Sequence, residues 1–149
     1  MLLVDGSPRA SAAGLASVGV VVCTPQGRVL AWRAAEAAAR TSMEAEYQAV
    51  IAGLELVQRR YAGAAVRCLS DCRIVIEQMN GRCAVRAAGL KPLHARATLL
   101  ARQIGRVEFR TIPRELNELA DALAGFRAAH GRVAGWLDRD RRESDTGLG

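Results

Sequence analysis

Hydrophobic residues in the first part of the chain gather in three short runs separated by turn-forming residues. The runs are Met1–Val4, Val18–Cys23 and Arg28–Arg33, and the residues Thr-Pro-Gln-Gly at 24–27 are typical of a hairpin loop. The residues Asp-Gly-Ser-Pro at 5–8 favour a turn directly after the first run. We therefore predict three strands in an antiparallel meander, with the first strand ending at Asp5.

The spacing of apolar residues changes to a helical period after Thr41. Positions three, four, seven and eleven residues beyond Glu46 are all apolar, namely Ala49, Val50, Gly53 and Val57. This pattern predicts a helix to about Arg60 that carries Glu46 on its core-facing side. A carboxylate on that side is costly unless a proton or a cation meets it.

A second acid near the start of this helix has a simpler interpretation. Glu44 follows Thr41 by three residues, which is the spacing of a capping box. We therefore favour a helix-capping role for Glu44 over a catalytic one.

Strands and helices alternate in the rest of the chain. The pattern predicts a strand at Ala64–Leu69, helices at Ile74–Met79 and Leu93–Ile104, a strand at Val107–Ile112, and a last helix capped by Asn117 and running to about His130. A meander followed by such alternation predicts an α/β domain with a mixed sheet and helices packed on it. We place this single domain at residues 1–130 and a frayed tail at 131–149.

Composition indicates the charge of a binding partner and argues against a zinc site. The 149 residues carry a net charge of +6, and Lys91 is the single lysine among 21 basic residues. The positive charge suggests an anionic partner such as nucleic acid. The alternative is that the many arginines reflect coding bias. No apolar run approaches the roughly 20 residues that cross a bilayer, and the first residues lack a basic signal region, so we expect a cytoplasmic protein. The four cysteines lack zinc-site spacing, which predicts reduced thiols.

Four acids stand out by their positions. Asp5 follows the first strand, Glu46 faces the core, Asp71 follows the fourth strand, and Asp121 lies one turn into the last helix. Each alone fits a turn residue or a helix-dipole partner. Together, at ~4–5 Å, each pair would repel by roughly 3–4 kcal/mol, so a converged cluster needs protons or hard cations.

Oxygen ligands without Cys or His favour magnesium or manganese over zinc. Two such ions can activate water and stabilise the leaving oxygen of a phosphodiester. The acids and the basic body therefore lead to the hypothesis of metal-dependent cleavage of a nucleic acid backbone.

Four motifs in family order resemble those of type 1 ribonuclease H, and the archaeal-type branch in particular. They are V-D-G-S at 4–7, A-E-Y with G-L-E at 45–55, S-D with Q-M-N-G at 70–81, and P-R-E-L-N-E-L-A-D-A-L-A at 113–124. The resemblance implies the ribonuclease H-like fold, a five-stranded mixed sheet with an antiparallel meander, two further parallel strands and helices on both faces.

The resemblance also implies an activity and a set of residues. The expected reaction is hydrolysis of the RNA strand of an RNA/DNA hybrid, with two Mg²⁺ ions (Mn²⁺ as an alternative), leaving a 5′-phosphate and a 3′-hydroxyl. It implies that Asp5, Glu46, Asp71 and Asp121 bind the metal, and it gives Arg114 either a role in product departure or a plain phosphate contact. The expected substrate contacts, for which solvated surface charge is the alternative at the basic positions, are Gly6, Ser7, Ser42, Arg82, Arg86 and Lys91.

Departures from the family pattern leave two alternatives open. Ser42 and Met43 replace the Asn pair that is implicated in contacting the hybrid, and no long basic protrusion follows Arg82. One alternative is a broader nuclease that also cuts double-stranded RNA. The other is a catalytically silent nucleic-acid-binding domain, although all four acids are present. We expect a monomer in either case.

Overall fold

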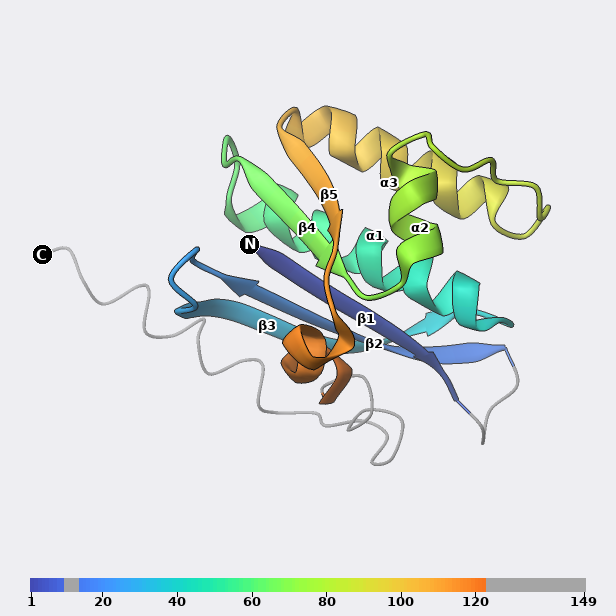
Figure 1. The fold of residues 1–149 in the computed structure, drawn as a ribbon, viewed down its shortest axis with the longest axis horizontal. Coiled ribbons are helices and arrows are strands. Elements are labelled where there is room, and N and C mark those ends of the chain that lie inside the picture. The colour runs from blue at the N-terminus through green and yellow to red at the C-terminus, as the bar shows by residue number, and fades with distance from the viewer. Residues whose placement is uncertain (10–13, 123–149) are drawn as a thin grey trace, which may run out of the picture.

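The computed structural model describes residues 1–9 and 14–122, which form a five-stranded sheet with helices on both faces. The sheet has the order β3-β2-β1-β4-β5 (Figure 1). Its strands are β1 (Leu2–Pro8), β2 (Leu15–Cys23), β3 (Val29–Ala38), β4 (Val66–Ser70) and β5 (Val107–Thr111). The first three strands are antiparallel, whereas β4 runs parallel to β1 and β5 runs parallel to β4. The predicted mixed sheet is confirmed.

The first strand is longer than predicted. Asp5 pairs with Gly19 of β2, and the pairing continues to Pro8 opposite Ala16. The predicted turn at Asp5 was wrong, because pairing with a buried neighbouring strand overrides the local preference of turn-forming residues. Asp5 therefore lies within β1, and Pro8 occupies the last position of the strand, where a missing N–H is tolerated.

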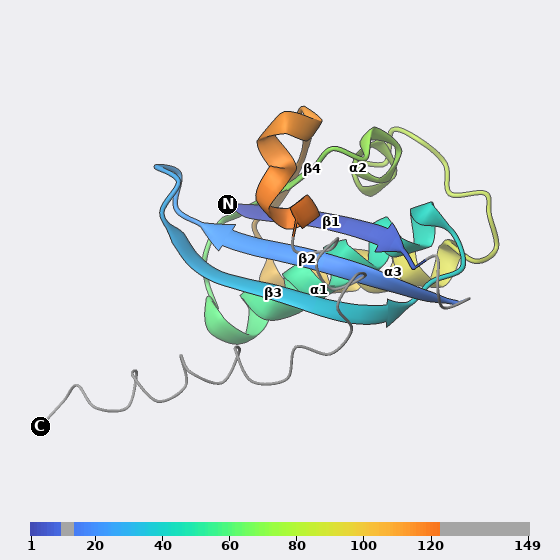
Figure 2. The same cartoon turned by 90° about the horizontal axis from the view of Figure 1, so that it is seen from below.

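The helices divide between the two faces of the sheet. They are α1 (Ser42–Arg60), α2 (Arg73–Met79), α3 (Lys91–Ile104) and the 3-10 helix η1 (Arg114–Asn117). α1 packs on β1 and β2, α3 packs on α1, and η1 lies on the opposite face against β1 and β4 (Figures 1 and 2). Within the described residues, no helix has the length and apolar character needed to span a membrane.

The start of α1 has the predicted capping chemistry. The Thr41 hydroxyl accepts the Glu44 N–H at 3.1 Å, and the Glu44 carboxylate accepts the Arg40 N–H at 2.7 Å. Two amides at the helix start are thereby satisfied. The assignment of Glu44 to the cap is confirmed, although its carboxylate reaches the residue before the N-cap.

The apolar stripe of α1 packs directly on the central strands. Ala49, Val50, Gly53 and Val57 are all buried, as the pattern predicted. A Cβ atom on Gly53 would lie 2.9 Å from the Val4 Cγ1 atom, so the absent side chain sets how closely α1 approaches β1. This close contact brings Glu46, on the same side of α1, up to the sheet.

Candidate active site

The site forms where two neighbouring parallel strands separate. β1 and β4 are paired only at Leu2 with Cys68 and at Leu3 with Leu69. Asp5 and Asp71 each lie two residues beyond the last pair, on either side of the resulting gap. Ligands in α/β sheets bind at such places, near the carboxyl ends of parallel strands.

Gly6 lets α1 come close enough to deliver a third acid to this gap. A Cβ atom on Gly6 would lie 2.1 Å from the carbonyl oxygen of Ala45, so no larger residue fits there without moving the helix. Glu46 follows Ala45, and the Gly6 N–H donates to its carboxylate, which lowers the pKa of Glu46. Gly6 thus has a packing role, and its contact with substrate stays a prediction.

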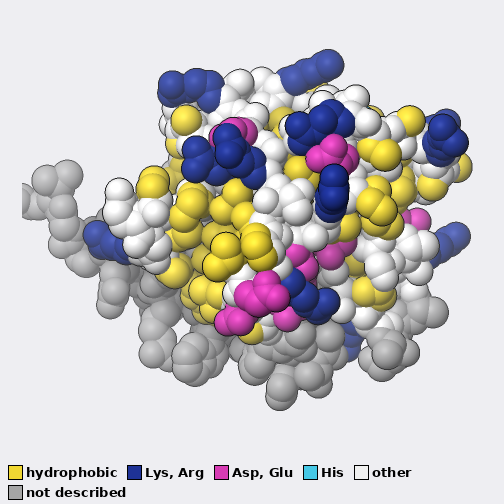
Figure 3. Space-filling model, in the orientation of Figure 1, with side chains coloured by type: hydrophobic (Ala, Val, Ile, Leu, Met, Phe, Trp, Pro, Cys, Tyr) yellow, Lys and Arg dark blue, Asp and Glu magenta, His cyan; other side chains and the backbone are white. Residues whose placement is uncertain are grey.

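The electrostatics show that the acids share one site. The pKa of Glu46 is raised from 4.5 to about 8, mainly by burial and in addition by the charges of Asp5 and Asp71. The pKa of Asp5 is likewise raised from 3.8 to about 6, mainly by burial and in addition by repulsion from Asp121 and Asp71. Figure 3 shows Asp and Glu side chains gathered near η1 on this face. Asp5 is therefore within electrostatic reach of Asp71 and Asp121, and Glu46 is within reach of Asp5 and Asp71.

One carboxylate oxygen in this region lacks a partner. The Glu46 Oε2 atom is buried and accepts no hydrogen bond from residues 1–9 and 14–122. A buried, unpaired carboxylate oxygen among other carboxylates suits a hard cation, and an oxygen-only donor set suits Mg²⁺ or Mn²⁺. The residues present therefore fit the implied metal.

The carboxylates of the acids are not arranged as a complete metal-binding site. Among residues 1–9 and 14–122, no group of three or more His, Cys, Asp or Glu side chains is close enough to hold an ion. Charge repulsion acts over longer distances than coordination, which requires about 2.0–2.1 Å between Mg²⁺ and oxygen. The acids can therefore repel one another and still be too far apart to share an ion, if their side chains must rotate to bind it. Metal binding by all four acids stays a prediction.

Asn117 is a residue of the site that sequence reasoning assigned incorrectly. Its side-chain amide donates to the Val4 carbonyl at 2.9 Å and to the Asp71 Oδ1 atom at 2.9 Å, and the residue is fully buried. It ends η1 directly before the helical residues 118–122, and its Oδ1 atom accepts no hydrogen bond from the described residues, so its side chain does not cap that helix, whose predicted continuation to His130 lies outside the described residues. By bridging β1 and the end of β4, Asn117 closes the gap between the strands and fixes one oxygen of Asp71.

Arg114 provides positive charge at the edge of the site. Its guanidinium lies 3.8 Å from the Asp121 Oδ1 atom, and the two side chains are 77% and 48% exposed. The same charge lowers the pKa of Asp5 and of Glu46. Arg114 is thus placed beside the acids with most of its side chain open to solvent.

The predicted substrate contacts lie at several places around the acids. Ser7 is half-buried in β1, and Ser42 is exposed at the first position of α1. Arg82 is held by Glu77 through two hydrogen bonds of 2.9 and 3.0 Å, whereas Arg86 and Lys91 are exposed. Substrate binding by these residues stays a prediction.

A buried polar network supports the loop that carries Arg86. The Tyr47 hydroxyl donates to the Gln78 Oε1 atom at 2.7 Å, and the Gln78 amide donates to the Ala84 carbonyl at 3.3 Å. Tyr47 and Gln78 are both buried. The network joins α1, α2 and the loop, so the motif residues Tyr47 and Gln78 position this region from within.

Comparison with known proteins agrees with the fold. A family model described as "Reverse transcriptase-like" matches residues 3–127. The bifunctional protein Rv2228c of Mycobacterium tuberculosis is 38% identical over 122 residues, which are 80% of this chain and 33% of that protein. The chain therefore spans about a third of the length of the curated relatives it matches.

Solved structures extend the likeness to three dimensions. The N-terminal RNase H domain of rv2228c from Mycobacterium tuberculosis, solved as a fusion with maltose binding protein, superposes with a TM-score of 0.75 at 35% identity, covering 84% of this chain and 95% of that one. RNase H1 from the halophilic archaeon Halobacterium salinarum gives a TM-score of 0.78 at 29% identity, covering 86% and 95%. LC11-RNase H1, solved in complex with an RNA/DNA hybrid, gives 0.77 at 29% identity, covering 84% and 93%. The matched family model, the sheet order and these neighbours show that the chain belongs to the Reverse transcriptase-like family, as a type 1 ribonuclease H domain.

Proposed function

We propose that this domain hydrolyses the RNA strand of RNA/DNA hybrids, leaving 5′-phosphate and 3′-hydroxyl ends. The observation that carries the proposal is the group of mutually repelling acids at the gap between β1 and β4, in which the buried Glu46 Oε2 atom has no hydrogen-bond partner among the described residues. A neighbour at 29% identity was solved with such a hybrid, which supports the choice of substrate.

Different residues of the site have different proposed roles in the reaction. Asp5, Glu46, Asp71 and Asp121 would hold two Mg²⁺ ions, which when bound activate water and stabilise the leaving oxygen. Asn117 holds Asp71 in place through its 2.9 Å hydrogen bond. Arg114, beside Asp121, would contact the phosphate and offset the charge of the departing product.

A broader substrate range is the second candidate. Met43, where many relatives carry Asn, is half-buried and its sulfur lies 3.9 Å from the Cys72 sulfur. A thioether packed in this way cannot provide the donors of an amide, so fewer contacts distinguish a DNA strand from an RNA strand. Cleavage of double-stranded RNA would follow from this loss of discrimination.

The test compares cleavage of RNA/DNA hybrid, double-stranded RNA and double-stranded DNA with Mg²⁺ or Mn²⁺. We expect the wild-type domain to cut the hybrid and Asp71→Asn to lose at least a hundredfold in rate, since it removes a ligand charge. Glu44→Gln is the matched control on α1, because Glu44 caps the helix start, and it should retain cleavage. Hybrid cleavage that survives Asp71→Asn would refute the metal assignment, and an inactive wild type that still binds the hybrid would indicate a binding module.

A further inference from the structure

A second charged feature lies outside the acids, in a groove between α2 and the edge strand β5. The groove has a volume of about 650 Å³, and its walls include Arg73 and Arg82 on the α2 side and Arg110 on β5. Figure 3 shows Lys and Arg side chains gathered over these two elements, above the acidic side chains near η1. Arg82 is among the substrate contacts predicted from the sequence, whereas Arg73 and Arg110 are not.

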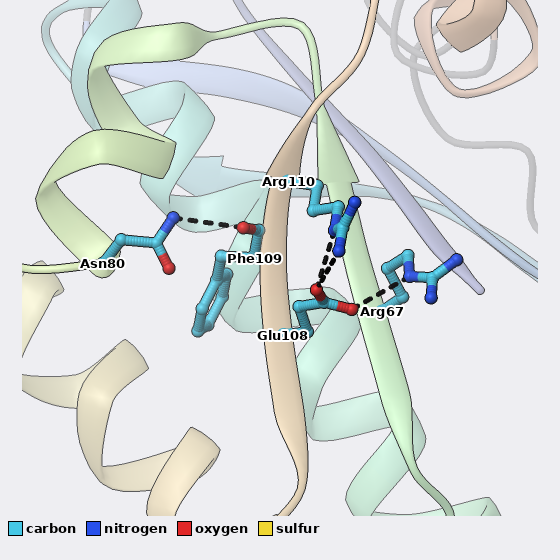
Figure 4. Close-up of polar contacts among 5 residues, drawn as sticks. All are labelled: Arg67, Asn80, Glu108, Phe109 and Arg110. Carbon is cyan, nitrogen blue, oxygen red and sulfur yellow. Dashed lines mark hydrogen bonds and ion pairs between the residues drawn. The ribbon is translucent and has the colours of Figure 1, made fainter.

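Two of the three groove arginines, Arg82 and Arg110, are paired with glutamates. Glu108 accepts from the Arg67 Nε atom at 3.0 Å and from the Arg110 Nε atom at 2.7 Å (Figure 4), and Glu77 holds Arg82 on the opposite wall. Arg73 makes no ion pair with any residue of the described part of the chain. Three arginines (Arg73, Arg82 and Arg110) against two glutamates (Glu77 and Glu108) give the groove lining a net positive charge.

Stability does not account for this arrangement. The side chains of Arg67, Arg110 and Arg82 are 52%, 60% and 62% exposed, and exposed ion pairs contribute ~0–1 kcal/mol. Guanidinium groups held in place with unused N–H donors are instead suited to phosphate oxygens, which they bind in a bidentate manner.

The groove opens next to the acids. Thr111 at the end of β5 pairs with Ser70, the residue before Asp71, and Arg73 begins α2 two residues after Asp71. A strand rises ~3.3 Å per residue, so Arg110 lies within a few residue lengths of the acid cluster. A polynucleotide that has one phosphate at the acids can therefore continue into the groove.

The edge of β5 is poorly suited to a peptide strand as an alternative occupant. The Asn80 side chain donates to the Phe109 carbonyl at 3.1 Å (Figure 4), which occupies a backbone acceptor that an added strand would need. Charge and shape together favour a phosphodiester backbone.

We propose that the groove between α2 and β5 binds the phosphate backbone of the nucleic acid beyond the cleavage site, through Arg73, Arg82 and Arg110. The identity of that nucleic acid rests on the proposed function, whereas the phosphate chemistry rests on the groove alone. The groove then sets affinity and the length of substrate engaged, and the acids set the chemistry.

The test measures binding of a fluorescently labelled RNA/DNA hybrid in EDTA as a function of salt, by anisotropy. Arg73→Gln/Arg110→Gln removes two proposed phosphate contacts, so the slope of log affinity against log salt should decrease by about 2. Arg28→Gln/Arg102→Gln is the matched control, since it removes the same charge from the β2–β3 turn and from the last turn of α3. The control should keep a slope close to that of wild type.

Equal slopes for the two double variants, or a groove variant with the wild-type slope, would overturn the proposal. If the groove variant fails to fold, Arg73→Gln alone is sufficient, because it leaves the glutamate-held arginines intact, and its slope should decrease by about 1. Cleavage with Mg²⁺ is measured in parallel. A lower slope for the groove variant, together with no cleavage by wild type, would support the groove proposal and refute the proposed hydrolase function. Cleavage by wild type, together with an unchanged slope for the groove variant, would support the hydrolase function and refute the groove proposal.

Discussion

Glu46 links the packing of α1 to the chemistry of the site. The residues that share its side of the helix are buried, and the same packing places its carboxyl group where water is scarce and other acids are near. The raised pKa is therefore a consequence of the fold, and it makes stability depend on pH.

Glu46→Gln should remove part of that dependence. Because the pKa of Glu46 is about 8 in the folded protein against an ordinary 4.5, the folded state keeps a proton between these pH values that the unfolded chain has released. The unfolding free energy of wild type therefore falls as pH rises across this window and then levels off. Without divalent ions, the variant should match wild type near pH 4 and exceed it near pH 9 by on the order of a few kcal/mol. Urea unfolding at both pH values measures this, and a variant weaker than wild type near pH 9 would contradict it.

Asn117→Ala should weaken both stability and cleavage. The change leaves the Val4 carbonyl without its donor and frees the Asp71 carboxylate, which costs about 1–3 kcal/mol. The matched control is Gln48→Ala, which also removes an amide donor to a carbonyl, that of Ala38 at 2.8 Å, but away from the acids. Measuring both the cleavage rate and the unfolding free energy of each variant separates a role in stability from a role in positioning Asp71. Equal cleavage by the two variants would argue against positioning by Asn117.

At the scale of elements, the sequence pattern predicted which strands and helices are present better than where each one begins and ends. Within the described residues, alternation and helical spacing identified the strands β1–β5 and the helices α1, α2 and α3, since these patterns reflect which face is buried. β1 was cut short at Asp5 because Gly6, Ser7 and Pro8 favour turns locally, whereas pairing with β2 keeps them extended. Asn117 was read as a cap because an Asn before a helix has that local chemistry, and its bond to Val4, 113 residues away, leaves no local signal.

The contact between α1 and β1 should respond very differently to alanine at its two glycines. At Gly6 the added Cβ meets backbone, 2.1 Å from the Ala45 oxygen, so α1 must move and the loss should be about 3 kcal/mol or more. At Gly53 the nearest atoms are side-chain carbons of Val4 and Leu2 at 2.9–3.0 Å, which can shift, and alanine improves helix propensity by ~1 kcal/mol. Urea unfolding of Gly6→Ala and Gly53→Ala compares them. Similar stabilities would mean that α1 is not held tightly at Gly6.

At the scale of the whole molecule, the sheet order explains why acids that are far apart in the sequence lie near the same gap. β1 is central, β4 lies beside it in parallel, and α1 crosses behind, so three acids from distant segments reach one gap. Family motifs were needed to select these acids, since each has an ordinary local interpretation. The orientation of the carboxylates depends on side-chain rotation and was not accessible from the pattern.

Because the site is assembled by the fold, a cation that binds it should stabilise the entire domain. Binding to the folded state alone adds about 2.7 kcal/mol at a hundredfold excess over the dissociation constant. At pH 5 both Asp5 and Glu46 hold protons in the folded protein, given pKa values of about 6 and about 8, so Mg²⁺ must displace them. The rise in melting temperature with Mg²⁺ should therefore be large at pH 9, small at pH 5, strongly reduced in Asp71→Asn and retained in Glu44→Gln. A rise of equal size at both pH values, or an undiminished rise in Asp71→Asn, would show that Mg²⁺ acts elsewhere on the protein.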